Sequence, residues 1–599
     1  MFHIVDLLSE LEFNRTSCDF CKMRWEACHH LDRSKVPIVR FDRDQSMLRL
    51  NEGLLPVLSI CRSPDFNHRD ARVIQIGLPR VTETFSSPHF GTLRHWISEC
   101  DTQHPTCHPP PNKVLRPPTR LIDVGTQETP IVRLFDTQRS SYTQSSPSSL
   151  DIATYKYIAL SHPWGAPPHF CTYVSTLAQH KQGIPTDGAD FPDTFRHAIT
   201  ITRELGLRYL WVDSICIIQG EDGDFDVEAK RMEDVFSSAY CVIAASSARG
   251  QRDGFLGARK ERQFLRLGDD TGAERGGLYV CRFIDNFGEH VLDSPLSKRG
   301  WVLQERALAR RTIYFTDWQA YWECGDGVRC ETMTKIDNKL ASFLGDPNFP
   351  SKLSDSLTDR GEKIRFYESL YQQYSRLDFT RIADRPVAIA GLEQRMLRDL
   401  GARGCFGIFD DGRSLLPRSL LWRRGKEVGT LQRIPAGTGK GDKISLPSWS
   451  WMAYDGAIDF LDLPLGGVEW NEDQIHGPWS VDGEPTVAEE VAAMGLGAVV
   501  RPFLKEPVDL HDQDEEDFEV VLDAGENAGT AGWEEWRCVV VGTKRVLKGG
   551  RAIPVAERTH YFLILKAAEG RSDMYNRIGV GKMAGTMIGG VLSSRVVVR

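Results

Sequence analysis

The middle of the chain predicts an α/β fold, in which helices cover a parallel β-sheet. Short apolar runs at residues 157–160, 209–218 and 240–245 are typical of strands that are buried on both faces. Residues 191–205 and 226–239, which separate these runs, carry apolar side chains at helical spacing. Strands that alternate with helices of this length form parallel sheets through right-handed crossovers, so the alternation predicts the fold class.

The individual elements carry their own boundary signals. The first run (YIAL) is followed by Ser161, Pro163 and Gly165, so a buried strand ends there in a turn. In the helical segment that comes next, Pro192 suits the first turn and Gly206 suits the C-terminal end. The second run (YLWVDSICII) and the third run (YCVIAA) are each predicted as one buried strand.

Polar side chains follow the predicted strands where ligands are expected. Open parallel sheets bind ligands at the carboxyl ends of their strands, beside a switch in strand order. Residues 161–165, 213–214 and 246–247 fall at that edge. Asp213 must be hydrogen-bonded or face a cleft, because burying a bare carboxylate costs several kcal/mol. Two interpretations stay open: Asp213 caps the following loop, or it contacts a polar ligand group such as a ribose hydroxyl.

A further segment, residues 294–309, contains a second candidate carboxylate. Trp301 and Glu305 are four residues apart and therefore lie on one face of a helix. A glutamate beside an aromatic side chain can have an altered pKa, as catalytic carboxylates do. The alternative is that Glu305 forms a surface ion pair with one of the nearby arginines, which are Arg299, Arg306 and Arg310.

The composition is that of a globular protein and excludes several classes. A chain of 599 residues suits two to four domains, and 41% hydrophobic residues are too many for a wholly disordered chain. The net charge of −9 argues against a globally basic nucleic-acid-binding protein. No apolar stretch approaches the roughly 18–20 residues of a membrane helix, and the first residues do not resemble a secretory signal. We expect a cytoplasmic protein that binds no nucleic acid and spans no membrane.

Shifts in composition predict four regions. Residues 1–135 form a small N-terminal module that contains the Cys and His groups, and the serine-rich residues 136–152 form a linker. Residues 153–332 hold the predicted parallel sheet. Residues 333–599 form an α+β C-terminal region.

The cysteines suggest a metal site and not a disulfide scaffold, because fourteen in so long a chain are too sparse for the latter. Cys18 and Cys21 have the CxxC spacing of a zinc half-site, and Cys100, His104 and Cys107 form a second group. Structural zinc takes four thiolate or imidazole ligands, so the two groups together could hold one ion. The alternative is that they are reduced thiols of the N-terminal module.

Four motifs, in this order, resemble those of the fungal heterokaryon incompatibility (HET) domain. They are residues 157–165 (YIALSHPWG), 205–219 (LGLRYLWVDSICIIQ), 232–248 (which contain SSAYCVIAASSA) and 299–311 (RGWVLQERALARR). Together they span about a quarter of the chain. One departure is His162, where the family often has tyrosine.

The resemblance implies a fold and a candidate chemistry. HET domains are considered remote relatives of Toll-receptor (TIR) domains, which have a flavodoxin-like parallel sheet. Some TIR domains hydrolyse NAD at the nicotinamide–ribose bond with a glutamate four residues after a tryptophan. By that resemblance Glu305 is the expected catalytic residue and NAD the expected substrate. The expected NAD-binding residues are Ser161, Trp164, Asp213 and Trp301.

The resemblance also implies a role in fungal non-self recognition that leads to regulated cell death. Two functions stay open within that role. In the first, the HET domain is an NAD-hydrolysing enzyme. In the second, it is a non-catalytic adaptor that signals by assembly, and Trp301 and Glu305 are core and cap residues. The expected partners are a second copy of the chain or another incompatibility protein.

Overall fold

The computed structural model divides the chain into two compact units. The first comprises Met1–Lys298 and Glu305–Phe349, and the second comprises Arg299–Gln304 and Pro350–Arg599. The structure describes residues 3–28, 31, 36–44, 46–51, 56–63, 65–66, 74–77, 81–108, 116–126, 129–137, 155–267, 277–283, 286–332, 335–336, 360–435, 446–464, 466–479, 495–507, 518–524, 532–545, 553–571 and 573–599. Of the predicted linker, residues 138–152 lie outside the described residues.

Four parallel strands form the centre of a nine-stranded sheet in the first unit. They are β7 (Tyr157–Ser161), β9 (Tyr209–Trp211), β11 (Cys241–Ala244) and β14 (Arg311–Phe315). β7 pairs with β9 on one side and with β11 on the other, and β14 lies beyond β11. Numbered along the chain, the strands therefore stand in the order 2-1-3-4. The α/β class and the parallel pairing predicted from the sequence are confirmed.

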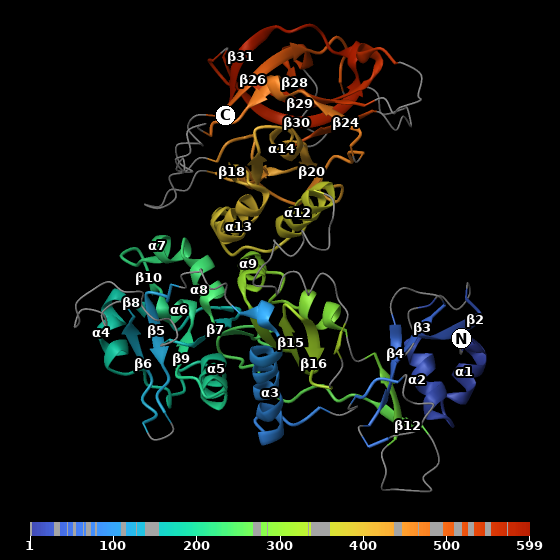
Figure 1. The fold of residues 1–599 in the computed structure, drawn as a ribbon, viewed down its shortest axis with the longest axis vertical. Coiled ribbons are helices and arrows are strands. Elements are labelled where there is room, and N and C mark those ends of the chain that lie inside the picture. Colours follow the sequence, from blue (N-terminus) through green and yellow to red (C-terminus); the bar gives the residue numbers. More distant parts are fainter. Residues whose placement is uncertain are drawn as a thin grey trace. The chain divides into compact units, whose positions relative to one another are not determined.

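Antiparallel strands extend this sheet at both edges. On one side β9 pairs with β5 (Arg120–Asp123), which pairs with β6 (Arg133–Asp136). On the other side β14 is followed by β15 (Ala320–Cys324), β16 (Gly327–Cys330) and β17 (Lys335–Ile336). Figure 1 shows blue β5 and green β15 in the same sheet, although almost 200 residues separate them. Segments before and after the four parallel strands thus complete the sheet.

The helices agree with the predicted pattern in part. Those of the sheet region are α3 (Ser87–Gln103), α4 (Val174–Gln182), α5 (Asp193–Glu204), α6 (Asp213–Cys216), α7 (Phe225–Ala229), α8 (Met232–Ser238) and α9 (Gly300–Leu308). The first predicted helix is α5, whose apolar face is buried. The second predicted helix is interrupted at Arg231, which donates to the carbonyl of Pro117 and to Thr119. Tertiary contacts therefore divide it into α7 and α8.

The apolar run at residues 209–218 was predicted as a single strand, and this prediction is wrong. β9 ends at Trp211, and the helical turn α6 begins at Asp213. The carboxylate of Asp213 accepts a hydrogen bond from the backbone N–H of Ser214 at 2.7 Å, as residues at helix starts often do. The chain continues into β10 (Ile218–Gln219), which pairs with β8 (Thr172–Tyr173). Hydrophobicity alone does not reveal this break.

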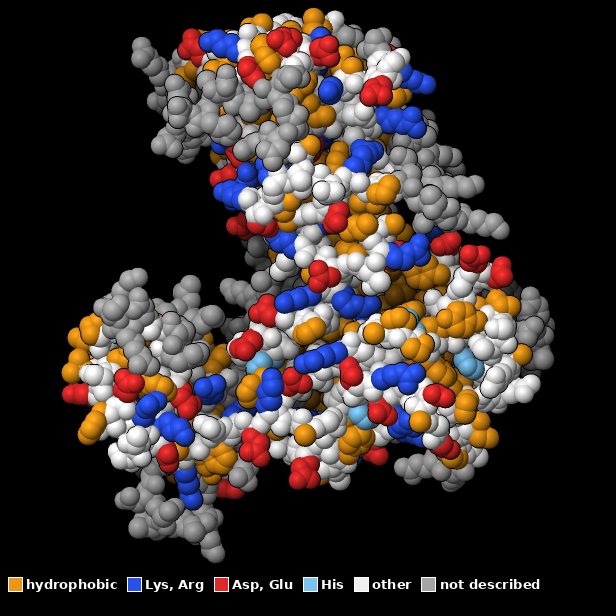
Figure 2. All heavy atoms as spheres, turned by 180° about the vertical axis from the view of Figure 1, so that it is seen from behind, with side chains coloured by type: hydrophobic (Ala, Val, Ile, Leu, Met, Phe, Trp, Pro, Cys, Tyr) orange, Lys and Arg blue, Asp and Glu red, His pale blue; other side chains and the backbone are white. Residues whose placement is uncertain are grey.

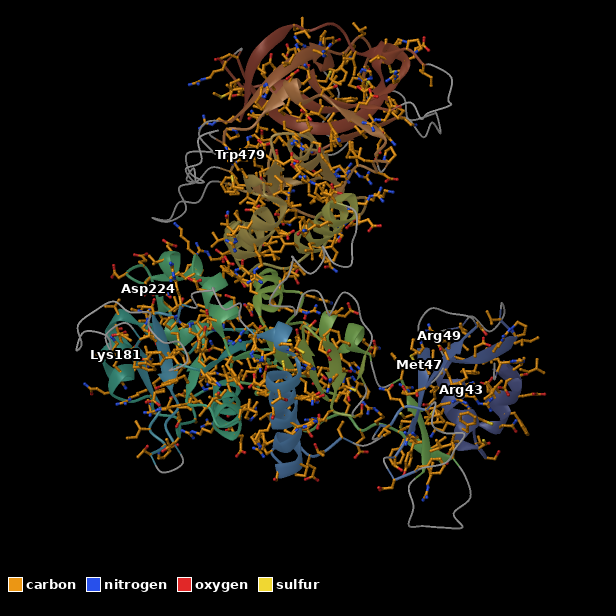
Figure 3. The ribbon with its side chains drawn as sticks, in the orientation of Figure 1. Arg43, Met47, Arg49, Lys181, Asp224 and Trp479 are labelled. Carbon is orange, nitrogen blue, oxygen red and sulfur yellow. The ribbon has the colours of Figure 1, made fainter. Side chains whose placement is uncertain are left out.

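Ion pairs join the edge strands to later segments of the same unit. Lys181 at the end of α4 lies 2.6 Å from the carboxylate of Asp136, and Arg120 of β5 pairs with Asp224. Lys181 and Asp224 are labelled in Figure 3. Arg120 is buried and also donates to the carbonyl of Cys216 at 2.6 Å. These contacts fasten residues 120–136 to the segments that follow β7 and β9.

The first unit also contains a six-stranded antiparallel sheet with two helices. Its strands, in sheet order, are β1 (His3–Leu7), β2 (Ile38–Asp44), β3 (Met47–Leu50), β4 (Pro56–Arg62), β13 (Leu278–Arg282) and β12 (Phe264–Leu267). Helices α1 (Leu8–Asn14) and α2 (Asp19–Ala27) share its hydrophobic core. Arg43, Met47 and Arg49, labelled in Figure 3, belong to β2 and β3. A hairpin from beyond residue 260 completes this sheet (Figure 1).

The second unit combines helices with an eight-stranded sheet. Its longer helices are α12 (Arg360–Ser375) and α13 (Ala390–Leu400), with the short α14 (Leu415–Ser419). The strands of the large sheet are β24 (Val468–Trp470), β25 (Ile475–His476), β26 (Leu496–Pro502), β27 (Glu519–Leu522), β28 (Arg537–Lys544), β29 (Thr559–Ala567), β30 (Met574–Ala584) and β31 (Ser593–Val598). Shorter pairs are β18 (Arg403–Cys405) with β19 (Ile408–Asp410), β20 (Trp422–Arg424) with β23 (Ile458–Phe460), and β21 (Gln432–Arg433) with β22 (Tyr454–Asp455).

The surface carries mixed charge. On the face that Figure 2 shows, Lys and Arg side chains are interspersed with Asp and Glu side chains over the described residues. The net charge of −9 is therefore not gathered into one acidic area on that face. Among the described residues, none of the helices has both the length and the apolar character required to cross a membrane.

Candidate functional site

Two predicted site residues from distant parts of the chain meet at the end of the first parallel strand. Ser161 is the last residue of β7 and is 3% exposed. Its hydroxyl donates a hydrogen bond to Oε2 of Glu305, which lies on α9 and is 9% exposed. The sequence separation is 144 residues, so the contact depends on the tertiary fold. The structure therefore brings together the two residues that were expected to share a site.

Asp213 lies at the same edge of the sheet as Ser161. β7 and β9 run parallel with Ala159 opposite Trp211, and Ser161 and Asp213 each follow two residues later. The indole N–H of Trp164 donates to Oδ2 of Asp213 at 2.7 Å. The Nδ1 atom of His162 lies 3.8 Å from Oδ1 of Asp213. The side chain of Asp213 keeps 26% of its area exposed, so this carboxylate accepts from the N–H of Ser214 in α6 and remains accessible to a ligand.

The turn after β7 depends on a close approach of two glycines. Gly165 has a φ of +74°, a conformation that favours glycine. A Cβ atom at this position would lie 2.7 Å from the Cα of Gly250, which follows β11. The side chain of Thr194 donates to the carbonyl of Gly250 at 2.9 Å. The loop that carries His162 and Trp164 is thus held against the loop after the neighbouring strand.

Two buried hydroxyl groups lie at this edge as well. Ser246 follows β11 and Ser214 follows Asp213, and both side chains are buried. Neither hydroxyl has a hydrogen-bond partner among the described residues. A buried hydroxyl that stays unsatisfied costs free energy, so such groups often mark a place where a ligand or water completes the hydrogen bonds. Residues 213–214 and 246–247 were both placed at this edge from the sequence.

The thiol of Cys171 is close to the same carboxylate but is not suited to nucleophilic catalysis. Burial raises the pKa of Cys171 to about 11, and the charge of Asp213 contributes in the same direction. A nucleophilic cysteine acts as the thiolate. At neutral pH Cys171 therefore stays protonated and does not supply a thiolate nucleophile at this edge.

Helix α9, which carries Glu305, is fixed by a buried ion pair. Arg306 donates two hydrogen bonds to Glu323 of β15, at 2.9 and 2.7 Å, and the hydroxyl of Tyr314 donates to the same carboxylate. Arg310 donates to the carbonyl of Ala239 at 3.0 Å. Arg306 and Arg310 thus have partners other than Glu305. Glu305 is buried and accepts from Ser161, so it does not lie on the surface as the ion-pair alternative assumed.

Trp301 lies one turn before Glu305 on α9, in the part of the helix that belongs to the second unit. Within that unit the N–H of Gly300 donates to the carbonyl of Asp378 at 2.9 Å, and Gln304 accepts from the N–H of Gly391 at 2.8 Å. The expectation that Trp301 forms an aromatic wall beside Glu305 stays a prediction. Trp164, which donates to Asp213, is the aromatic side chain tied to the edge of the sheet.

A second cluster in the first unit is suited to a metal ion. Cys100, His104, Cys107 and Cys324 are all buried, and their ligand atoms lie within 4.8 Å of one another. Cys100 belongs to α3, and Cys324 is the last residue of β15. Hydrogen bonds among the thiols lower the pKa of Cys107 and raise that of Cys100. Thiolates and imidazoles are the donors that zinc prefers, so these residues fit a tetrahedral zinc site.

The composition of this cluster differs from the predicted one. Cys100, His104 and Cys107 come together as expected, but Cys18 and Cys21 are not part of the cluster. Cys18 caps the start of α2, where its sulfur accepts from the N–H of Cys21 at 3.3 Å. The fourth position is taken by Cys324, which the sequence analysis missed. The sequence ECGDG offered a signal, because Asp-Gly after an apolar run is typical of a hairpin turn.

Comparisons with known proteins agree with this part of the chain. Residues 157–305 match the family model described as "Heterokaryon incompatibility protein (HET)". The chain is also similar to "Heterokaryon incompatibility protein 6, OR allele" of Neurospora crassa, with 26% identity over 234 residues. That alignment covers 33% of this chain, and the chain spans about a third (34%) of the length of that relative. No solved structure matches the chain.

The matched segment begins with β7 and ends with Glu305, so it contains the whole edge of the sheet described above. The resemblance that the four motifs indicated is thereby confirmed: residues 157–305 of this chain match the family model of the heterokaryon incompatibility (HET) domain.

Proposed function

We propose that this protein acts in fungal non-self recognition and cell death, and that its HET domain hydrolyses NAD at the nicotinamide–ribose bond. The role in incompatibility is supported by the matched family and by the name of the Neurospora crassa relative. The chemistry is supported chiefly by one observation: buried Glu305 accepts a hydrogen bond from Ser161 at the carboxyl end of the first parallel strand. Glutamate in this position is what the distant resemblance to TIR domains implies.

The topology of the sheet also favours a nucleotide ligand. The strand order 2-1-3-4 is that of flavodoxin-like sheets, in which the switch point lies between the first and third strands. In this chain these are β7, which ends with Ser161, and β11, which Ser246 follows. Fold analogy alone does not establish an activity, so the proposal stands on the polar groups gathered there.

In the proposed reaction, the bond between ribose C1′ and the nicotinamide ring nitrogen breaks. Its electron pair goes to the ring nitrogen, which loses its positive charge, and an oxocarbenium-like centre develops on the ribose. The carboxylate of Glu305 would stabilise that centre, and Ser161 would orient the carboxylate. Water then forms the new bond to C1′ and releases a proton, so the products are nicotinamide, ADP-ribose and H⁺.

The other residues of the edge would bind the substrate. Asp213 has exposed carboxylate area that can accept a hydrogen bond from a ribose hydroxyl. Trp164, held by Asp213, would provide an aromatic surface for the nicotinamide ring. Zinc is the second expected cofactor. In this proposal it is a structural ion bound by Cys100, His104, Cys107 and Cys324, because four protein donors leave no open position for catalysis.

The test is nicotinamide release by the purified full-length chain, measured at low and high protein concentration. Wild-type protein should release nicotinamide, and Glu305→Gln should lower the rate by at least roughly 100-fold, as expected when a group that stabilises transition-state charge is neutralised. Ser161→Ala should lower it less. Glu289→Gln is the control, because Glu289 is an exposed glutamate of the same unit. Absence of release by wild-type protein in every oligomeric state would contradict the enzymatic proposal.

The alternative function is a non-catalytic adaptor that signals by assembly with a second copy or another incompatibility protein. Exposed apolar side chains favour it: Tyr173, Val174 and Val227 are 44%, 56% and 63% exposed. Tyr173 lies opposite Gln219 in the pair of β8 with β10, and α7 with Val227 follows shortly after β10. Sedimentation of wild-type protein and Val227→Asp tests this, since an assembly through this surface should weaken with the charge. Assembly without nicotinamide release would favour the adaptor.

A further inference from the structure

We infer that a zinc ion bound by Cys100, His104, Cys107 and Cys324 sets the position of the helix that carries Glu305. The importance of Glu305 rests on the proposed function, whereas the metal site and its mechanical link to α9 stand on the geometry of the cluster. The ion would act as a clip between α3 and the β15–β16 hairpin, and the hairpin would hold α9.

The four ligands have the chemistry and spacing of a closed structural site. Zinc–sulfur bonds of about 2.3 Å in a tetrahedron place the ligand atoms about 3.8 Å apart. The ligand atoms of the cluster lie within 4.8 Å of one another, and Nδ1 of His104 lies 3.5 Å from the sulfur of Cys324. All four side chains are buried, which excludes water from the positions around an ion.

The surroundings of His104 provide an independent sign of a metal site. Its Nε2 atom lies 3.3 Å from the carboxylate of Asp326, while its Nδ1 atom faces the cysteines. Histidines that bind zinc usually donate their second ring N–H to such a carboxylate, which fixes the ring and its tautomer. Asp326 is in the turn directly after Cys324, so one hairpin supplies both a ligand and the residue that orients another.

The link from the cluster to Glu305 passes through neighbouring residues. Cys324 is preceded in β15 by Glu323, whose carboxylate holds Arg306 through two hydrogen bonds. Arg306 follows Glu305 directly on α9. Glu323 is fully buried and Arg306 is 9% exposed, so this pair cannot shift without exposing or stranding a charge. A displacement of the end of β15 is therefore transmitted to α9.

A second contact makes the clip rigid. Asp101, next to Cys100, pairs with Arg311 at 2.8 Å, and Arg311 begins β14 opposite Cys324. The end of α3 is thus attached to β14 by the ion pair and to β15 by the metal. Two attachments to adjacent strands fix the end of α3 in both position and rotation. Loss of the ion would keep the ion pairs of α3, from Asp101 to Arg311 of β14 and from Glu99 to Arg329 of β16, but would remove the link through the metal between Cys100 and Cys324.

The first experiment measures metal content in the full-length chain purified under reducing conditions. Wild-type protein should contain about one zinc per chain, and cobalt in its place should give the strong visible absorption of a tetrahedral thiolate site. Cys324→Ser should lose most of the bound metal. Cys330→Ser is the matched control, because Cys330 is a buried cysteine of the same hairpin outside the cluster. Protein without metal, or with a disulfide among these cysteines, would overturn the inference.

The second experiment measures backbone hydrogen exchange in α9 with and without the metal. Chelation of wild-type protein should accelerate exchange over residues 300–308 and in β15 by at least about tenfold, while α5 stays unchanged, because only the first two are attached to the clip. Glu323→Gln should keep the zinc but exchange rapidly over residues 300–308 with or without it. Equal exchange in α9 with and without metal would overturn the link.

These readouts separate the inference from the proposed function. If zinc binds and protects α9 but nicotinamide is not released, the NAD proposal fails and the positioning by the metal stands. If nicotinamide is released but the chain binds no metal, the inference fails and the enzymatic proposal stands.

Discussion

Each of the two units contains a buried glutamate, and the two glutamates differ in the charge of the groups that they contact. In the first unit, Glu331 at the end of β16 pairs with Arg259 and accepts from the N–H of Ala320 at 2.9 Å. In the second unit, Glu393 of α13 accepts from the hydroxyl of Tyr371 at 3.1 Å and from the N–H of Gly407 at 2.6 Å. One carboxylate is balanced by a cation, and the other is surrounded by neutral donors.

This difference sets the protonation of the two side chains. Burial alone would raise the pKa of Glu331, but the hydrogen bond with His89 and the charge of Arg259 outweigh it and lower the pKa to about 2. Burial raises the pKa of Glu393 to about 7, because its hydrogen bonds from Gly407 and Tyr371 do not compensate for the lost hydration. Depth of burial therefore does not decide whether a carboxylate is ionised; the charge of its partner does.

The largest effect is expected when the charge balance of the first unit is broken at Glu323. Glu323→Gln would leave the guanidinium of Arg306 buried without its anionic partner, and breaking such a pair costs about 3–5 kcal/mol. Thermal unfolding of the full chain should shift down by several degrees. The control is Arg94→Gln, which removes an exposed pair with Glu204 and should cost at most about 1 kcal/mol. Equal shifts in the two variants would show that burial of the pair has no consequence.

The next effect concerns acid stability of the first unit. The folded-state pKa of Glu331 lies below its ordinary value of 4.5, so its contribution is present above pH 4.5 and is lost as the pH falls toward 2. The loss is on the order of 3 kcal/mol. Denaturant unfolding from pH 2 to 6 should show wild-type protein more stable than Glu331→Gln at pH 6, with the difference shrinking in acid. A difference that does not change with pH would contradict the assignment of an ionised Glu331.

The sequence predicted the elements whose signals are local. The run at residues 157–160 and the helical spacing at residues 191–205 correspond to β7 and α5, and the four motifs located the segment that the HET family model matches. The break at Asp213 was missed, because a helical turn between two short strands has the same hydrophobicity as one long strand. Polar contacts of Arg231, which divide the second predicted helix, arise from residues more than 100 positions away.

The sequence identified residues of both candidate sites, but not the contacts that bring them together. Ser161 and Glu305 could be named from motifs, but their hydrogen bond depends on the position of α9, which the buried Arg306–Glu323 pair sets. For the metal cluster, the three ligands close in sequence were identified and the fourth was not. Cys324 comes to the cluster only because β14 and β15 pair in one register, and spacing in the sequence does not contain that information.

The smallest effect on stability is expected in the second unit, which should lose stability as the pH rises, whereas the first unit loses it as the pH falls. The folded-state pKa of Glu393 lies above its ordinary value of 4.5, so its contribution is complete below pH 4.5 and is lost as the pH rises through 7. Between pH 6 and 8 the second unit should lose about 1 kcal/mol, and Glu393→Gln, which cannot ionise, should remove this dependence. Hydrogen exchange of α12 and α13 at these two pH values, corrected for the intrinsic rate, measures this loss of stability.

Tyr371→Phe sharpens the comparison, since loss of the hydroxyl donor should raise the pKa of Glu393 further and move the loss of stability to higher pH. If the second unit instead became less stable in acid, as expected for the first, a cation would have to accompany Glu393, and the contrast between the two units would fail.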